Sequence, residues 1–411
     1  MTKNQNDLEF FNVIGGKSRP ADKYHKVMEP RAEEELQDAP TASTKGLDDA
    51  VAASQEAFKS FRWSTNADRR ELLLAVRQNI LNNVELLTAI LTRETDKSEL
   101  MAQIEVERAA FHFESYADTQ LEDELQYEDD EVKILAQSVV PTRFYQALSS
   151  NANIGEQMTL HPGIAHISFT GTTNVERKIA AICARTVKKV ILEMASSHAS
   201  IVCEDVNLAE AVPKVAQACL FHAGQICVAA KRIYVHEMIY DELLNMLKKE
   251  NKKYAIAEDA SLPLMFDPLS NRVNYEQCLD ILDDPPIIVT RPPEDSYLVA
   301  EEQFGPIIPV MSWADETDVI ALSNIHNGGL GASFHTPDLD RAQKIARQLE
   351  SGTVWINKSE IPHHANFVEG MKLSGYGGEL GKQALLSYCY TDISIWEVMQ
   401  CKKCMRAGLF L

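Results

Sequence analysis

The stretch between Ile164 and Leu220 alternates short apolar runs with longer amphipathic ones, and this alternation constrains the fold more than any other feature of the chain. AHISFT, KKVILEMA and SSHASIVCED have the pattern of strands, whereas GTTNVERKIAAICART and NLAEAVPKVAQACLF have the periodicity of helices. Strands and helices that alternate at this spacing favour βαβ units, whose strands are parallel. The sequence therefore predicts an α/β fold built on a parallel sheet.

Composition limits the classes of function. The 411 residues are 45% hydrophobic, which is enough apolar material for two or three cores of ordinary size. A formal net charge of −20 argues against nucleic acid as a partner, because phosphates repel an acidic surface. The start, MTKNQNDLEF, lacks the apolar core of a signal peptide, and no run approaches membrane-spanning length. We expect a cytoplasmic protein with no membrane contact.

The cysteines predict a reduced protein without a metal centre. Eight of them are spread through apolar segments without paired spacing, which is typical of free thiols in the cytosol. Cys401 and Cys404 form a single Cys-x-x-Cys near the C-terminus. Without a second pair, such a motif is more often incidental than a metal or redox site.

The flanking segments predict further elements. Residues 10–42 contain two β-like runs broken by a Gly-Gly pair and two prolines, which indicates an arm or a hairpin, and a helical periodicity follows from residue 46 to about residue 123. The acidic run LEDELQYEDDEV, at 121–132, is predicted to be a linker or an exposed face. TDISIWEVMQ near the C-terminus is a β-like run that can pair with a strand of this or another subunit.

Two motifs are candidates for chemistry. In FHAGQICV, Cys227 follows a glycine-containing turn, where a thiol can act as a nucleophile if its pKa is lowered or a base takes its proton. The alternative is that Cys227 is one more small buried hydrophobic residue. The turn Gly171-Thr172-Thr173 joins a strand to a helix N-terminus, which can hold a phosphate. It lacks the three spaced glycines of the dinucleotide fingerprint.

Ordered motifs along the chain resemble the aldehyde dehydrogenase superfamily. They are FTGTT (169–173), LEMASS (192–197), FHAGQIC (221–227), EEQFGP (301–306), SGTVWIN (351–357) and MKLSGYGGELG (371–381). The resemblance covers most of the chain. It implies an incomplete Rossmann-type cofactor domain, an α/β catalytic domain and a β oligomerisation arm. We place these parts at 1–44 (N-terminal arm), 45–193 (cofactor-binding domain, internally shortened), 194–375 (catalytic domain) and 376–411 (C-terminal return and oligomerisation strand).

The resemblance also implies a function: oxidation of an aldehyde to a carboxylic acid with NAD or NADP, in a homodimer or homotetramer. In that chemistry a thiolate attacks the aldehyde, hydride leaves for the nicotinamide, and water hydrolyses the thioester. By position, Cys227 is the expected nucleophile and Glu193 the expected general base. The expected cofactor-binding residues are Gly171, Thr172 and Thr173 beside the diphosphate, and Glu302 and Phe304 beside the nicotinamide and its ribose.

The sequence departs from the family pattern at several positions. A Trp-Asn-Phe-Pro motif, whose asparagine serves the oxyanion hole, and a Lys-Pro-Ser-Glu motif, whose lysine contacts the adenosine ribose, are both absent between Tyr116 and Leu148. A strand–helix section of the cofactor domain is therefore expected to be missing. Glu176 replaces the glycine after the Gly-Thr-Thr turn, and His222 and Ala223 replace an Asn-Gln pair.

These departures leave two alternatives to an active dehydrogenase. One is a catalytically impaired scaffold or partner subunit, because the loss of a strand and its helix removes part of the crevice where a dinucleotide sits. The other is a hydrolase that handles thioesters with Cys227 and Glu193 and needs no cofactor. The loss of the oxyanion asparagine alone argues less strongly against an active dehydrogenase, since one such donor contributes roughly 10² to 10³ in rate.

Overall fold

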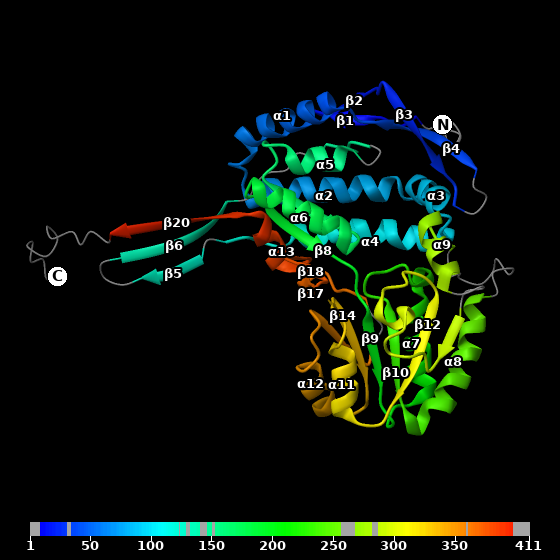
Figure 1. The fold of residues 1–411 in the computed structure, drawn as a ribbon. Coiled ribbons are helices and arrows are strands. Elements are labelled where there is room, and N and C mark those ends of the chain that lie inside the picture. The colour runs from blue at the N-terminus through cyan, green and yellow to red at the C-terminus, as the bar shows by residue number, and fades with distance from the viewer. Residues whose placement is uncertain are drawn as a thin grey trace, which may run out of the picture.

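The computed structural model describes residues 9–30, 34–122, 124–128, 132–139, 146–149, 153–255, 268–281, 287–358 and 361–397. Its body has two parts (Figure 1). One part holds the N-terminal helices, and the other holds a six-stranded sheet with helices on its two faces. A narrow three-stranded sheet projects from the side of the body. The Cys-x-x-Cys at Cys401 and Cys404 lies outside the described residues.

The six-stranded sheet is parallel throughout and has the order β11-β12-β10-β9-β14-β15. Its strands are nearly continuous apolar runs, as expected for a sheet that is covered on both faces. The strands are β9 (His198–Val202), β10 (Ala230–His236), β11 (Ile287–Thr290), β12 (Ile307–Trp313), β14 (Gly331–His335) and β15 (Thr353–Ile356).

Successive side chains of these strands point to opposite faces and enter two separate cores. Ile233 and Val235 of β10 pack against α7 (Leu208–Leu220) and α8 (Tyr240–Ala255). Tyr234, between them, packs on the other face with α11 (Glu316–Asn324) and α12 (Leu339–Ala346). The two cores fix the sheet, and with it the loops at its strand ends.

A second sheet has the order β18-β8-β7. The strands β7 (His166–Thr170) and β8 (Lys189–Glu193) are parallel and are joined by α6 (Thr173–Arg185), which confirms the predicted βαβ unit. The short strand β18 (Gly375–Tyr376) pairs antiparallel with the other edge of β8. Within the described ranges, this sheet has only these two parallel strands, in agreement with an incomplete Rossmann-type domain.

The pattern that predicted one parallel sheet in fact spans two. β8 belongs to the smaller sheet and β9, only five residues further along the chain, to the larger. The connection 194–197 is held at both ends. The Ser374 hydroxyl donates to the Ala195 carbonyl at 2.9 Å, and the Arg232 guanidinium donates to the Ser197 carbonyl at 2.7 Å. This connection is the seam between the two parts of the body.

Four helices follow the N-terminal strands, as the periodicity predicted: α1 (Thr44–Phe61), α2 (Asn66–Asn82), α3 (Val84–Thr95) and α4 (Glu99–Ala117). Their starts are encoded locally. The Ser43 side chain caps α1, and Thr65 and Asp68 form a capping box at α2. The remaining helices are α5 (Asn153–Leu160), α9 (Arg272–Ile281), α10 (Tyr297–Ala300) and α13 (Gly381–Tyr388).

The projecting sheet, which we call the arm, has the order β20-β6-β5 and is antiparallel (Figure 1). It consists of β5 (Glu124–Glu128), β6 (Val132–Val139) and β20 (Tyr390–Glu397). The acidic run predicted to be a linker or an exposed face therefore contributes strands, although the side chains of β5 are indeed exposed. A backbone can form ladder hydrogen bonds whatever charges its side chains carry, so the acidic pattern did not reveal β5.

The N-terminal strands, in the segment predicted as an N-terminal arm, are not part of this projecting sheet. They pair with one another as β1 (Asn12–Ile14) with β2 (Lys17–Arg19) and β3 (Lys23–Met28) with β4 (Glu35–Thr41). The Gly-Gly pair supplies the turn between β1 and β2, where Gly15 and Gly16 have φ of 60° and 72°. The domain limits given above remain predictions.

Candidate active site

Cys227 lies between the short helix η2 (Phe221–Gly224) and β10, and its side chain is half-buried. The turn before it is strained, because His222, Ala223 and Gly224 all have left-handed backbone angles. That conformation costs a non-glycine residue about 1–2 kcal/mol. Gly224 cannot be replaced there without displacement of the backbone, since a Cβ would lie 2.6 Å from the carbonyl oxygen of Gly305. Such strain persists where surrounding contacts enforce it.

The surroundings of Cys227 hold its sulfur in the thiol form at neutral pH. Burial, followed by the negative charges of Glu193 and Glu302, raises the pKa of the Cys227 thiol to about 11. The backbone N–H groups of Val228 and of Cys227 itself act in the opposite direction. A thiol in this state needs a base to take its proton before it can attack a carbonyl.

Glu193 is the last residue of β8, and its charge acts on the Cys227 thiol. It pairs with Gly375 of β18 across the sheet edge, where a Cβ on Gly375 would lie 2.2 Å from the Leu192 carbonyl oxygen. Burial and the nearby Glu379 raise the pKa of Glu193 to about 7. Among the described residues, Glu193 Oε1 is buried and accepts no hydrogen bond. A carboxylate with this pKa is matched to proton transfer near neutral pH.

Glu302 and Phe304 lie in the loop between α10 and β12, on the other side of Cys227. Glu302 Oε1 accepts a hydrogen bond from the Ser196 backbone N–H at 3.3 Å. Burial raises the pKa of Glu302 to about 7, against the opposing effects of Lys231 and of the Ser196 N–H. Phe304 has a left-handed φ of 45°, which turns this loop back toward the nucleophile segment.

The turn Gly171–Thr173 lies at the N-terminus of α6, and no side chain of the described residues caps that end. Gly171 N–H donates to the Glu193 carbonyl at 3.1 Å, so the turn is tied directly to the strand that carries the predicted base. A Cβ on Gly171 would lie 2.6 Å from the Phe169 ring, which explains the glycine. The N–H groups of Gly171, Val175 and Glu176 already donate to backbone carbonyls, so an anion can meet only the other amide groups of this turn.

Glu193 is linked to the Gly171 turn by the Gly171 N–H and acts by its charge on Cys227, as Glu302 does. Thr172 and Thr173 share that turn, and Phe304 shares the loop of Glu302. Sequence reasoning missed Lys231, whose Nζ lies 5.8 Å from the centroid of the Phe304 ring, and Glu379, which acts on Glu193. A lysine inside the apolar run AAKRIYV was the available signal for Lys231. Glu379 gave no such signal, because its closeness to β8 depends on the fold.

The chain matches the sequence model described as "Aldehyde dehydrogenase family" in three consecutive segments, at residues 17–130, 130–285 and 284–393. The chain belongs to the aldehyde dehydrogenase family. It is 29% identical to aldehyde dehydrogenase LUC3 from Fusarium sp, over 93% of this chain and 97% of that protein. The aligned region has 456 positions, more than the chain has residues, so part of that relative has no counterpart here.

Solved structures of the family share the fold. An NAD-dependent aldehyde dehydrogenase from Sinorhizobium meliloti matches with a TM-score of 0.89 at 22% identity, over 96% of each chain. Lactaldehyde dehydrogenase from Escherichia coli matches with a TM-score of 0.88 at 21% identity, over 94% of this chain and 99% of that one. The structural neighbours include a betaine aldehyde dehydrogenase from Staphylococcus aureus in complex with NAD+ and an NADP-dependent Escherichia coli enzyme.

Glu176 is the feature of this aldehyde dehydrogenase that fits a dinucleotide least well. It lies in the first turn of α6 and is fully buried, and neither of its carboxylate oxygens has a hydrogen-bond partner among the described residues. Burial and the charge of Glu193 raise the pKa of Glu176 to about 7. An uncharged carboxyl group is compatible with a neighbouring diphosphate. At a pKa of about 7, Glu176 carries less charge toward an anion at this turn than a fully ionised carboxylate would.

Replacement of Glu176 by glutamine is expected to tighten NAD+ binding at pH 8 about tenfold, because above its pKa the carboxylate opposes a second anion. In the unchanged protein the affinity should fall as the pH rises through 7, since binding then requires uptake of a proton. Calorimetric titration of NAD+ between pH 6 and 9 measures both effects. Glu210→Gln, in the exposed first turn of α7, is the matched control. Equal pH dependence in both variants would contradict the prediction.

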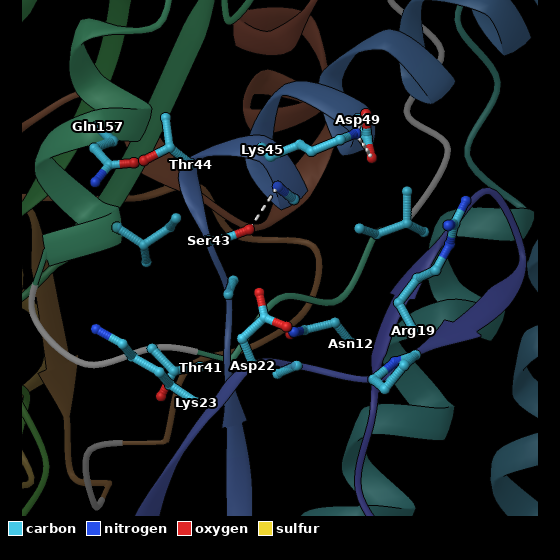
Figure 2. A pocket seen from close by; sticks show the side chains of 16 residues that line it. Asn12, Arg19, Asp22, Lys23, Thr41, Ser43, Thr44, Lys45, Asp49 and Gln157 are labelled. Carbon is cyan, nitrogen blue, oxygen red and sulfur yellow. Dashed lines mark hydrogen bonds and ion pairs between the residues drawn. The ribbon is translucent and has the colours of Figure 1, made fainter.

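Two cavities lie outside the predicted residues. A small one of about 110 Å³ adjoins the nucleophile segment and is lined mainly by apolar side chains, among them Phe221, Ile226 and Ile361. A larger one of about 440 Å³ lies between the N-terminal strands, the start of α1 and α5 (Figure 2). Its charged lining has both signs, and Lys45 is paired with Asp49. None of the seven predicted residues lines either cavity.

Among the described residues, no helix is long and apolar enough to cross a membrane. The same residues contain no group of three or more side chains suited to hold a metal ion.

Proposed function

We propose that this protein oxidises an aldehyde to a carboxylic acid with NAD or NADP, using Cys227 as the nucleophile and Glu193 as the general base. The observation that supports the proposal is a half-buried thiol that feels the charge of Glu193, a carboxyl group with a buried Oε1 at the end of a strand of the other sheet. The pKa of Glu193 is about 7, so this group is half-ionised at neutral pH and can accept a proton.

The first step is attack of the Cys227 sulfur on the aldehyde carbon. The thiol proton passes to Glu193, the new C–S bond forms, and the carbonyl oxygen becomes an anion. Because the asparagine motif is absent, stabilisation of that anion relies on backbone N–H donors, and those of Cys227 and Val228 already act on the sulfur. We expect a rate below that of an enzyme with the full oxyanion hole.

The second step breaks the C–H bond of the adduct, and the chemistry that NAD(P)+ supplies is acceptance of the leaving hydride. Glu302 and Phe304 would hold the nicotinamide end, and the Gly171–Thr173 turn would hold the diphosphate. Loss of hydride leaves a thioester on Cys227. Glu193 releases the thiol proton to solvent and then takes a proton from water, and the hydroxide adds to the thioester carbon. The C–S bond breaks, the carboxylic acid leaves, and the sulfur recovers its proton from Glu193.

The test is direct. Purified protein is titrated with NAD+ and NADP+ by calorimetry and is then assayed with straight-chain, branched and aromatic aldehydes for formation of reduced cofactor at 340 nm. Binding of one cofactor and an aldehyde-dependent signal are expected. Absence of both would overturn the proposal and favour the impaired scaffold. Ester turnover without cofactor, lost in Cys227→Ala, would instead favour the cofactor-independent hydrolase.

We further propose that the arm pairs subunits into a homodimer or homotetramer. β20 is an edge strand of the arm, and its neighbouring outward side chains, Ile393 and Ile395, are 62% and 66% exposed. Exposed apolar side chains along an edge strand favour pairing with another chain. The negative net charge of each subunit does not prevent this pairing, because the side chains expected in the contact, Ile393 and Ile395, are apolar.

Replacement of Ile395 by glutamate is expected to shift the assembly toward the monomer, because a charge buried in an apolar contact is costly. Multi-angle light scattering measures the mass against the 46.0 kDa of one chain. Ile325→Glu is the matched control, since Ile325 is 64% exposed but lies on the catalytic part of the body. A monomeric unchanged protein, or equal masses for both variants, would contradict the proposal.

A further inference from the structure

Lys231 is a fully buried lysine in β10, four residues after Cys227. Its Nζ donates a hydrogen bond to the carbonyl oxygen of Gly224 and lies over the ring of Phe304, 5.8 Å from the ring centroid. Lysine is almost never fully buried unless its ammonium group is paired. Both contacts favour the charged form, because a carbonyl oxygen and an aromatic face each attract a cation.

These two contacts lie on the two backbone turns that enclose the nucleophile. Gly224 has a left-handed φ of 71° and ends the strained turn before Cys227, and Phe304 has a left-handed φ of 45° in the opposite loop. A Cβ on Gly224 would lie within 2.6 Å of the Gly305 carbonyl oxygen, so the two turns already touch. One ammonium group therefore contacts both turns, close to the point where they meet.

The charges around Lys231 complement its position. Burial lowers the pKa of Lys231, whereas Glu302 first, and then three thiols that include Cys227, raise it. An electrostatic interaction is reciprocal, so the ammonium group also favours the thiolate, although by less than burial, Glu193 and Glu302 disfavour it. Glu193 and Glu302 act on Cys227 in the opposite sense and oppose its ionisation.

We propose that Lys231 is a positioning residue for the nucleophile, whose buried ammonium group fixes the turn that presents Cys227 and offsets the negative charge of the neighbouring Glu302. The inference rests on the proposed function for the role of Cys227. Ionisation of the thiol can nevertheless be measured in the free protein, without aldehyde, cofactor or turnover. A lysine that only filled space or anchored the backbone would leave the charge seen by Cys227 unchanged.

The experiment compares two alkylating agents on the full chain at pH 9: neutral iodoacetamide and anionic iodoacetate. Modification of Cys227 is followed by tandem mass spectrometry, in which the fragment ions assign the modified residue and distinguish Cys227 from the buried Cys219 and Cys278. In Lys231→Met, alkylation by iodoacetamide is expected to slow about tenfold, because a rise of about one unit in the pKa of Cys227 lowers the thiolate population tenfold. Alkylation by iodoacetate should slow several-fold more, because an anion also loses the attraction of the ammonium group.

Lys214→Met is the matched control, because Lys214 also donates to a backbone carbonyl, that of Asn357, at 3.0 Å. Its rates should equal those of the unchanged protein. Lys231→Gln retains a donor for Gly224 without the charge and serves if the methionine variant does not fold, as judged by thermal melting. Unchanged rates, or equal losses for the two reagents, would overturn the role of Lys231 and leave the dehydrogenase proposal intact. Failure of the unchanged protein to oxidise any aldehyde would overturn the dehydrogenase proposal and leave the role of Lys231 intact.

Discussion

Replacement of Cys227 by alanine is expected to abolish aldehyde oxidation, with a loss of about 10⁴-fold or more in kcat, because no other group can form the covalent adduct. The side chain is half-buried at the end of a turn whose conformation is set by Gly224 and its neighbours, so the fold should tolerate the loss of one sulfur atom. Steady-state formation of reduced cofactor measures the activity, and calorimetry should give unchanged cofactor binding.

The control is Cys219→Ala, which removes a fully buried thiol from the last turn of α7, eight residues earlier in the chain. This variant should keep its activity and lose only about 1 kcal/mol of the free energy of unfolding through a small cavity. Residual turnover in Cys227→Ala at more than a hundredth of the original rate would show that the reaction does not pass through this thiol.

Replacement of Glu193 by glutamine is expected to lower kcat by about 10² to 10⁴, the usual contribution of a positioned general base. The pH dependence should change as well. The pKa of Glu193 is raised to about 7, and only its carboxylate form accepts a proton, so the rate of the unchanged enzyme should rise with pH up to 7 and level off above it. In the glutamine variant this rise should disappear.

The Glu379→Gln variant tests whether the charge of Glu379 helps to set the pKa of Glu193. Glu379 accepts hydrogen bonds from Ser168 and Tyr388 at 2.8 and 2.6 Å and raises the pKa of Glu193 by its charge. Its removal should move the rise in rate to lower pH without removing it. A kcat profile that is identical in Glu193→Gln and in the unchanged enzyme would assign the base to another group.

Most of the fold could be predicted from the sequence because its elements are encoded locally. The strand and helix patterns from AHISFT onward became β7, α6, β8, β9 and α7 in the predicted order. Their division between two sheets could not be predicted, because it depends on the four-residue connection 194–197. That connection is held by Ser374 and Arg232, which lie far away in the chain.

The site residues likewise divide into those that a sequence motif reveals and those that only the fold brings close. Cys227, Glu193 and the Gly-Thr-Thr turn were accessible because ordered motifs carry them, and the geometry brings them together. Lys231 and Glu379 act only through burial and through distances between segments remote in sequence, which no local pattern expresses. The strands of the arm in the acidic run were missed for a related reason: β5 forms through pairing with β6, whereas its own side chains read as solvent-exposed.

The seam also has a consequence for cooperativity. Ser374 accepts from the Gly329 N–H at 2.7 Å and donates to the Ala195 carbonyl, and Arg232 binds the Ser197 and Ser323 carbonyls from within the larger sheet. Cys227 lies just before β10 of the larger sheet, and Glu193 ends β8 of the smaller one. Local loosening of either sheet therefore separates the two catalytic groups long before the protein unfolds globally. The working lifetime of the site is set by this handful of hydrogen bonds rather than by the stability of either core.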